Sequence, residues 1–187
     1  MYRLQIFLPT PRLVKATVTV ALVIGGVFYS SSSVASEATS LKQNSMMTAA
    51  SSSSEKSEFT NLVQQVHQQI NQYRGSLNLA PLSLNALISE QAKIHSQQMA
   101  QQLVKLGHQG FEARIEALEA DLAARSAAEN VAYNQGYRNP ADRAVIGWIK
   151  SETHRQNIVG NYNLTGIGIA QNQQGEYYFT QIFILEN

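Results

Sequence analysis

The sequence contains no cysteine among its 187 residues, only four prolines and a single tryptophan. The lack of cysteine excludes disulfides, a thiol nucleophile and a thiolate–zinc site, so a metal ion would have to be bound by histidine, carboxylate or amide side chains. Charged residues are also scarce, at 14% of the chain, and the net charge is only +1. Apolar residues make up 44%, which is enough to build a hydrophobic core.

The distribution of charge argues against a nucleic-acid partner. Residues 1–36 contain Arg3, Arg12 and Lys15 but no acidic residue. Without this segment the chain has 11 basic and 13 acidic side chains, a net charge of −2. Proteins that bind nucleic acids neutralise phosphates with clustered lysine and arginine, which such a chain lacks.

Residues 1–36 have the pattern of a secretory signal peptide. The three basic residues precede an uncharged, mostly apolar run over residues 16–29, and small residues suited to signal peptidase follow at 34–36. The run is shorter than the roughly 20 residues that a membrane span needs. An uncleaved N-terminal anchor is the alternative. In either case we expect the rest of the protein to be secreted, extracellular or periplasmic at the cell envelope, with no membrane span after cleavage.

The remaining sequence divides into a linker and one domain. Residues 37–57 include Ser51-Ser52-Ser53-Ser54 and have no periodic apolar face, so they are predicted to be a disordered, serine-rich linker. The folded domain is expected over residues 58–187.

The apolar spacing within this domain changes from that of helices to that of strands. Segments with helical features are residues 59–73, 84–106, 112–125 and a segment that opens with Asn139-Pro140. Residues 165–170 and 176–185 are instead typical of two strands joined by a turn. Helices followed by a β-hairpin predict an α+β fold, in which helices cover an antiparallel sheet.

Residues 147–158 join the end of one predicted helix to the start of a shorter one. Ser151 has the residue type of an N-cap, whose hydroxyl accepts hydrogen bonds from backbone N–H groups two or three residues later. His154 would then lie in the first turn, where the positive end of the helix dipole favours the neutral imidazole that binds metal or accepts a proton. A histidine that only packs and hydrogen-bonds locally is the alternative.

Three other histidines and one glutamate are candidates for a site. His108 lies in a glycine-flanked loop where packing does not require it, and loops on a rigid scaffold often carry binding groups. His95 is on the predicted inward face of a helix and is expected to be structural, whereas His67 is expected at a solvated rim. Glu129 lies between small residues and a strand-like run, and it becomes functional only if a partner points at it.

Taken in order, these features resemble the CAP superfamily, the group of cysteine-rich secretory protein, antigen 5 and pathogenesis-related 1. Its bacterial branch of SCP-like extracellular proteins is the closer match. The matching segments run over residues 59–185 and are Ile70–Arg74, Leu79–Leu82, the Ala92…His95-Ser96…Met99-Ala100 helix, His108, Ala128–Ala132, Trp148…Ser151…His154…Ile158 and Tyr178–Phe183. The resemblance implies a three-layer α-β-α sandwich with a central antiparallel sheet. It also implies a cleft lined by histidine and glutamate, which holds a divalent cation such as zinc in some members.

Residue by residue, the resemblance carries over three metal-ligand positions. His108 matches the first histidine of the cleft, Glu129 matches its first glutamate, and His154 stands where the bacterial branch has a histidine. Two positions depart from the animal pattern. Ser151 stands where that branch has a second glutamate, and Tyr178 where it has a second histidine. We therefore predict His108, Glu129 and His154 as ligands of zinc or another divalent cation, with Ser151 and Tyr178 as further residues of the binding cleft.

Three functions are consistent with this set of residues. The favoured function is a binding module, whose cleft holds a divalent cation or small ligand and whose surface meets a lipid or envelope component. The second is a structural cleft, in which His–Glu hydrogen bonds hold the sheet to the helices. The third is a metal-dependent hydrolase, peptidase- or esterase-like, with a metal-bound water and a base such as Glu152. A serine nucleophile is disfavoured, because the cap explains Ser151 and no oxyanion loop is found.

Overall fold

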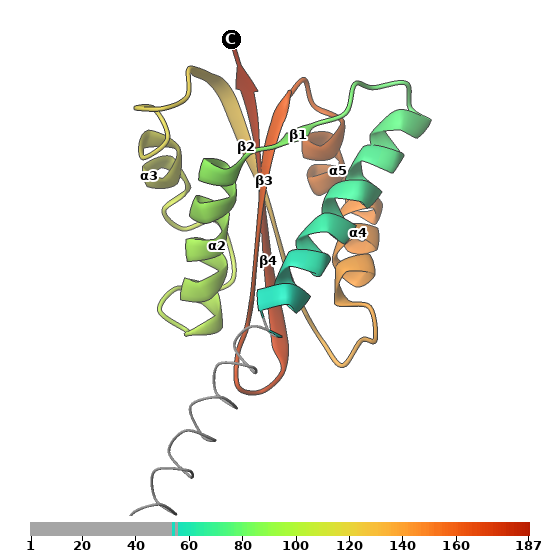
Figure 1. Ribbon diagram of the computed structural model, residues 1–187, viewed down its shortest axis with the longest axis vertical. Helices are drawn as coiled ribbons and strands as arrows, with labels where there is room; N and C mark the ends of the chain where they lie inside the picture. The colour runs from blue at the N-terminus through green and yellow to red at the C-terminus, as the bar shows by residue number, and fades with distance from the viewer. Residues whose placement is uncertain (1–53, 55) are drawn as a thin grey trace, which may run out of the picture. The chain divides into compact units, whose positions relative to one another are not determined.

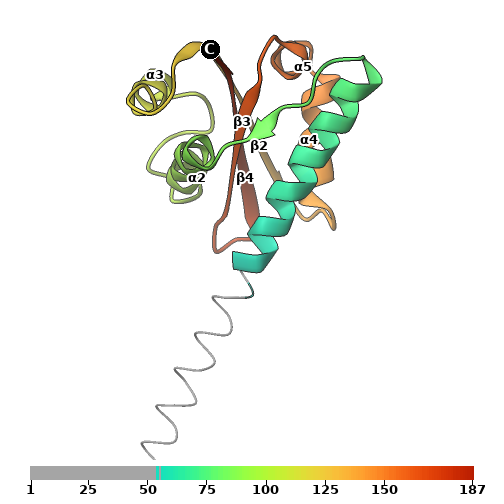
Figure 2. The same ribbon diagram turned by 45° about the horizontal axis from the view of Figure 1, so that its top comes forward.

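The computed structural model describes residues 54 and 56–187, and these form a three-layer arrangement (Figures 1 and 2). The predicted signal peptide, residues 1–36, lies outside the described residues, as does most of the predicted linker. A helix is already present at residues 56 and 57, which the sequence assigns to that linker. Within the described residues, no helix has both the length and the apolar character that a membrane span requires.

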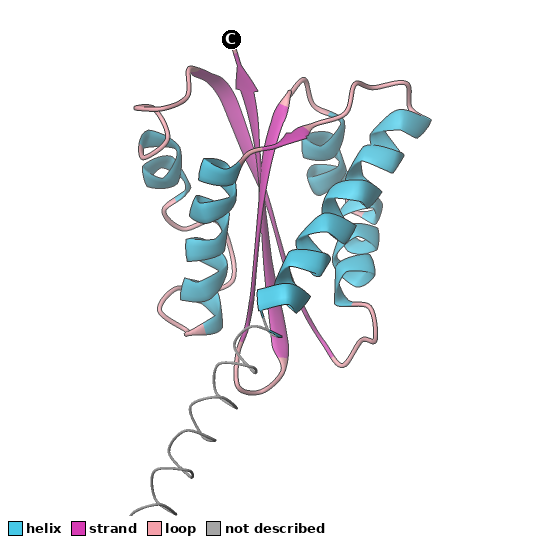
Figure 3. Ribbon diagram, in the orientation of Figure 1, coloured by secondary structure: helices cyan, strands magenta, loops and turns pink. Residues whose placement is uncertain are grey.

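The helices are helix 56–76, α2 (Ala86–Ala100), α3 (Phe111–Glu116), α4 (Pro140–Lys150) and α5 (Glu152–Val159). The strands are β1 (Ser83–Leu84), β2 (Ala124–Gln135), β3 (Leu164–Gln171) and β4 (Glu176–Glu186). Figure 3 shows the sheet edge-on between two groups of helices. Helix 56–76, α4 and α5 lie on one side, and α2 and α3 lie on the other.

The strands are ordered β1-β3-β4-β2, so the C-terminal hairpin lies at the centre of the sheet. β4 pairs antiparallel with both β3 and β2, whereas the two residues of β1 pair parallel to β3. The predicted α+β sandwich and the predicted hairpin are therefore confirmed. The sheet is mixed rather than purely antiparallel, because the short β1 is added at one edge.

Alternate residues of β4 supply the core of both layers, because successive side chains of a strand point to opposite faces. Phe179 and Phe183 pack in one cluster with Trp148 of α4 and with Val66 and Ile70 of helix 56–76. On the other face, Ile182 and Ile184 pack with apolar side chains of α2 and of the segment after α3. Each helical layer is thus held to the sheet by apolar burial.

α2 lies directly against β3 at two glycines. A Cβ atom at Gly166 would lie 2.3 Å from the carbonyl carbon of Ile88, and one at Gly168 would lie 2.0 Å from the backbone nitrogen of Lys93. Both contacts are with helix backbone, which cannot rotate away as a side chain would. The glycines therefore set the distance between the helix and the sheet.

Two predicted helices are shorter in the structure than in the sequence analysis. α2 ends at Ala100 rather than at residue 106, and Leu103 and Leu106 are 70% and 55% exposed. Met99 and Ala100 already pack against Ala170, the next-to-last residue of β3, so a longer helix would extend past the sheet.

The predicted helix 112–125 is present only over Phe111–Glu116. A series of turns follows, because the chain has to enter β2 at Ala124. Leu118 and Leu122 of this segment are nonetheless buried.

Candidate functional site

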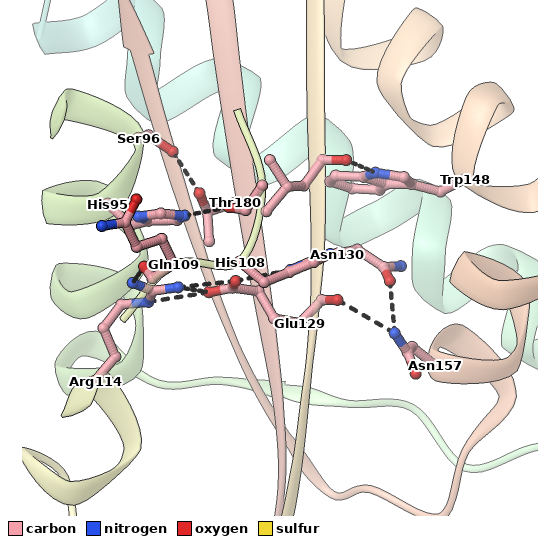
Figure 4. A network of polar contacts seen from close by, with 12 residues as sticks. His95, Ser96, His108, Gln109, Arg114, Glu129, Asn130, Trp148, Asn157 and Thr180 are labelled. Carbon is pink, nitrogen blue, oxygen red and sulfur yellow. Dashed lines mark hydrogen bonds and ion pairs between the residues drawn. The ribbon is translucent and has the colours of Figure 1, made fainter. Parts of the chain in front are cut away.

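Glu129 lies at the centre of a buried polar group that also includes Arg114 and His108 (Figure 4). Arg114 donates from Nε to Oε2 of Glu129 at 3.0 Å, and from Nη2 to Oε1 and Oε2 at 2.8 and 2.7 Å. The Glu129 and Arg114 side chains are only 2% and 8% exposed. Nδ1 of His108 lies 3.0 Å from Oε1 of the same carboxylate. One buried carboxylate therefore contacts both Arg114 and His108.

The register of β2 explains why Glu129 points into this layer. Glu129 pairs with Ile182 of β4, whose side chain packs against α2. Arg114 approaches from α3, and its Nη1 donates to the backbone carbonyl of Gln109 at 2.9 Å. That bond fixes the loop that carries His108. Sequence analysis identified His108 and Glu129 but missed Arg114.

The contact with Glu129 sets the orientation of the His108 ring. An ionised carboxylate only accepts hydrogen bonds, so Nδ1 of His108 carries the proton and donates it. In the neutral ring the lone pair is then on Nε2, and the side chain is 54% exposed. Metal-binding histidines commonly have this arrangement, with a carboxylate behind the ring and the other nitrogen free for a ligand.

Ser151 and His154 form a second contact, at the start of α5. Ser151 occupies the N-cap position, but its hydroxyl caps no backbone N–H group. That part of the sequence prediction is wrong, because the hydroxyl instead lies 2.8 Å from Nδ1 of His154. Here too the contact engages Nδ1 and leaves Nε2 for other partners.

The surroundings of His154 favour its neutral form through burial, whereas the sequence prediction relied on the helix dipole. Burial lowers its pKa, and the charge of a protonated His108 lowers it further. Both effects disfavour the charged imidazolium. The neutral ring is the form that can bind a metal ion.

Two asparagine side chains, one on β2 and one on α5, connect the elements that carry these two contacts. Asn157 donates from Nδ2 to the carbonyl oxygen of Glu129 at 3.2 Å and to Oδ1 of Asn130 at 2.9 Å. Asn130 donates from its own Nδ2 to the carbonyl of His154 at 3.1 Å. Figure 4 shows the side chain of Glu129 on one side of β2 and its carbonyl facing Asn157 on the other. The two asparagines therefore fix α5, and with it His154, against the strand that carries Glu129.

Tyr178 belongs to a different polar group, at the hairpin end of the sheet. Its hydroxyl donates to Oε2 of Glu176 at 3.1 Å, and the hydroxyl of Tyr133 donates to Oε1 at 2.9 Å. Tyr178 pairs with Tyr133 in the sheet, four positions along β2 from Glu129. At about 3.3 Å per residue, that separation is roughly 13 Å. The predicted place of Tyr178 in the binding cleft therefore stays a prediction, and its contacts are with Glu176 instead.

The predicted metal ligands fit a bound cation only in part. The residues that the structure describes contain no group of three or more His, Asp or Glu side chains placed to hold a metal ion. Both oxygens of Glu129 accept from Arg114, which leaves this carboxylate poorly suited to direct ligation. The two imidazole Nε2 atoms remain as candidate donors. Glu129 is better placed to orient His108 than to bind the ion itself.

Glu152 has the position of a base next to His154, but its contacts are with its own helix. Arg155 forms an ion pair with this carboxylate, and Gln156 donates to it at 3.2 Å. The side chain of Glu152 is 64% exposed. These contacts give the hydrolase hypothesis no further support.

His95 is a packed structural histidine and His67 lies at a rim, as the sequence predicts for each. His95 is completely buried, and its Nε2 lies 2.7 Å from the carbonyl of Gly107. His67 is half-buried at the rim of helix 56–76, where its Nε2 contacts the carbonyl of Leu82 at 2.8 Å. Within the residues that the structure describes, neither ring forms a hydrogen bond to His108 or His154.

Acid is expected to destabilise the protein through His95. Burial lowers the pKa of this histidine, outweighing the opposite effect of the hydrogen bond to Gly107. The unfolded chain binds a proton near pH 6.5, at which the folded protein does not. The stability that the protein gains from a neutral, buried His95 is therefore complete above pH 6.5 and decreases below it. We expect the urea unfolding free energy to be lower at pH 5.0 than at pH 7.5, and the difference to be smaller in His95→Gln. An equal pH dependence in the variant would contradict this prediction.

A large groove lies at the opposite edge of the sheet from β2. Its volume is about 1250 Å³, and it is lined by residues of helix 56–76, α2, β3 and the following turn. None of the predicted site residues lines it. The histidine contacts and the groove are therefore two separate features of the domain.

The chain belongs to the CAP family, the cysteine-rich secretory protein family. The sequence profile of this family matches residues 67–183, which span the layers and contacts described above. This finding confirms the resemblance noted in the sequence. No functionally curated protein is a detectable relative of the chain.

Solved bacterial structures share the fold. An extracellular protein with an SCP domain from Bacillus anthracis is 23% identical with a TM-score of 0.55, over 67% of this chain and 41% of that protein. An outer surface protein of Borrelia burgdorferi is 17% identical with a TM-score of 0.58, over 68% of this chain and 94% of that protein. A cysteine-rich secretory protein of Staphylococcus aureus is 19% identical with a TM-score of 0.53, over 67% of this chain and 38% of that protein. The chain thus spans about two fifths of the Bacillus and Staphylococcus proteins, and the likeness concerns the fold.

Proposed function

We propose that the protein is a CAP-domain binding module that acts outside the cytoplasm, and that His108 and His154 are its ligand-binding groups. The ligand class is a divalent cation such as zinc, or a small molecule with a group that pairs with neutral imidazole. Two observations support the location. The leader-like residues 1–36 precede the domain, and the structural relatives are described as extracellular or outer-surface proteins.

The observation that carries the proposal is the support behind each imidazole. Glu129 holds Nδ1 of His108, and Ser151 holds Nδ1 of His154. The free nitrogen of each ring is therefore Nε2, and burial lowers the pKa of His154, which favours its neutral ring. A bound zinc ion would take Nε2 of both rings and complete its coordination with water. Glu129 would then act behind His108, as an orienting carboxylate rather than as a ligand.

Calorimetric titration of the protein with zinc chloride tests this proposal. We expect a saturable binding signal in the wild-type protein. We expect at least tenfold weaker binding, about 1.4 kcal/mol, in His108→Ala and in His154→Ala. His67→Gln is the matched control, because it changes a histidine outside the group and should bind as the wild type does. Equal affinities in all four proteins, or no binding to the wild type, would refute a metal-binding role.

A further inference from the structure

A groove runs along the β3 edge of the sheet, and the largely buried residues Ile167–Ala170 form its floor. Figure 1 shows β1 crossing only the upper end of this edge, with α2 and helix 56–76 on either side below it. Residues of helix 56–76, β1, α2 and β3 line the groove, together with the turn after β3. β1 pairs only with Leu164 and Thr165. The six following residues of β3 therefore have no neighbouring strand on this edge, and they pair only with β4 on the other side.

The backbone of β3 presents unpaired peptide groups to this groove. The carbonyl of Thr165 accepts from the N–H of Asn85, so Thr165 faces outward from the sheet. Peptide groups alternate along a strand, and those of Ile167, Ile169 and Gln171 therefore face the same way. Ser89 Oγ accepts from the N–H of Ile167 at 3.3 Å. Residues 54 and 56–187 supply no hydrogen bond to the outward groups of Ile169 and Gln171.

β3 lacks the usual features that keep a sheet edge from pairing. Its sequence, Leu-Thr-Gly-Ile-Gly-Ile-Ala-Gln, contains no charged residue and no proline. Edge strands commonly carry such residues, because unpaired N–H and C=O groups otherwise attract another strand. Burying these groups without a partner also costs free energy. The edge therefore favours a ligand that has a backbone of its own.

The two walls of the groove differ in character. Helix 56–76 contributes the apolar side chains Phe59 and Val63, whereas α2 contributes Gln97 and other polar side chains. Side chains of a strand added to β3 would point alternately toward these two walls. An apolar–polar alternation in the ligand would therefore complement both walls.

The charge of the groove favours an acidic group on the ligand. Lys56 and Lys93 line it, against the single carboxylate of Glu90, which lies 3.6 Å from Nζ of Lys93. Lys56 lies toward the hairpin end of β3. The hydroxyl of Tyr177, which pairs with Gln171, contacts Glu58 two residues after that lysine.

We propose that this groove binds an extended polypeptide segment, which adds to β3 as a further strand. The segment pairs with the outward carbonyl of Ile167 and with the outward N–H and C=O groups of Ile169 and Gln171, over about 17 Å for five residues. Its side chains alternate between apolar and polar, and an acidic side chain or a carboxyl terminus lies near Lys56. This mode of recognition takes its affinity from main-chain hydrogen bonds and its specificity from alternate side chains.

Selection from a phage-displayed library of random linear decapeptides, with the full chain as bait, tests the proposal. We expect enriched peptides with alternating apolar and polar residues and an acidic group. Their binding is then measured by fluorescence polarisation against three variants. Gln171→Pro removes one outward N–H at a strand edge, where proline is tolerated, and should weaken binding at least tenfold. Gln171→Ala keeps that N–H and should bind as the wild type does. Lys56→Glu should weaken the binding of the acidic peptides. This variant tests the proposal without altering β3.

Three results would overturn the proposal. The first is no enrichment over a selection without bait. The second is equal binding to the wild type, to Gln171→Pro and to Lys56→Glu. The third is slow hydrogen exchange of the Ile169 amide in the free protein, which would mean that the edge is already paired. Since the groove and the histidines lie at opposite edges of the sheet, none of these results bears on zinc binding by His108 and His154.

Discussion

Replacing Arg114 by methionine is expected to lower the free energy of unfolding by about 3–5 kcal/mol. The variant leaves the Glu129 carboxylate, 2% exposed, without the three hydrogen bonds that Arg114 donates. A buried charge without its partner loses far more than an exposed ion pair contributes, which is at most about 1 kcal/mol. Urea unfolding followed by circular dichroism measures the difference.

The double variant Arg114→Met/Glu129→Leu separates the charge effect from the loss of packing. Removing both members of a buried pair is often neutral, because neither charge then remains unpaired. We expect the double variant to be more stable than Arg114→Met alone. Arg125→Met, at an exposed position of β2, is the control and should change stability by less than about 0.5 kcal/mol. A double variant less stable than the single variant would show that the pair does more than neutralise a buried charge.

Gly168→Ala is expected to destabilise the protein by about 3 kcal/mol or more. The added Cβ would lie 2.0 Å from the backbone nitrogen of Lys93 and 2.2 Å from the carbonyl carbon of Ala92. Neither atom can move unless α2 moves as a whole, and that movement would open the core between the helix and the sheet. The unfolding midpoint in urea is the measurement, with the slope of the transition as a check on two-state behaviour.

The same substitution at Gly147 is a matched control with the opposite expected sign. Gly147 is exposed within α4, and a Cβ atom there would have no neighbour within 4 Å. Alanine in an exposed helix interior is favoured over glycine by about 0.5–1 kcal/mol. Gly147→Ala should therefore stabilise the protein. If both glycine variants shift the unfolding midpoint equally, the close approach of α2 to β3 does not determine the effect of alanine at position 168.

The fold can be predicted from the sequence where apolar periodicity and burial coincide. Val66 and Ile70 mark the buried face of helix 56–76, and the alternation after residue 165 locates β3 and β4. The prediction fails beyond Ala100, because the apolar spacing continues through Leu103 and Leu106 although the sheet to cover has ended. The length of a helix depends on its partner, and the position of that partner is not encoded in local spacing.

The site is less predictable than the fold, because its contacts join distant parts of the chain. His108 and Glu129 can be identified from their surroundings in the sequence. Arg114 has the appearance of an ordinary solvated residue of a helix rich in alanine and glutamate. The available signal was chemical: a glutamate within an apolar strand requires a cation, and Arg114 is one of the few candidates nearby. The bond from Ser151 to His154 was missed because an N-cap explained the serine equally well.

The central position of β4 has a consequence for the order in which the protein folds. Within residues 56–187, β4 is the only partner strand of β2, although about 40 residues separate the two strands in the chain. α2 likewise packs on β3 and β4, which are synthesised long after it. A nascent chain that ends before Glu176 therefore carries helices with apolar faces and no complete sheet to cover. Such topologies, dominated by contacts between distant residues, fold slowly and expose apolar surface until the last strand is available. Folding of this domain should begin only when its C-terminal hairpin has formed, and holding that hairpin back would keep the whole domain unfolded.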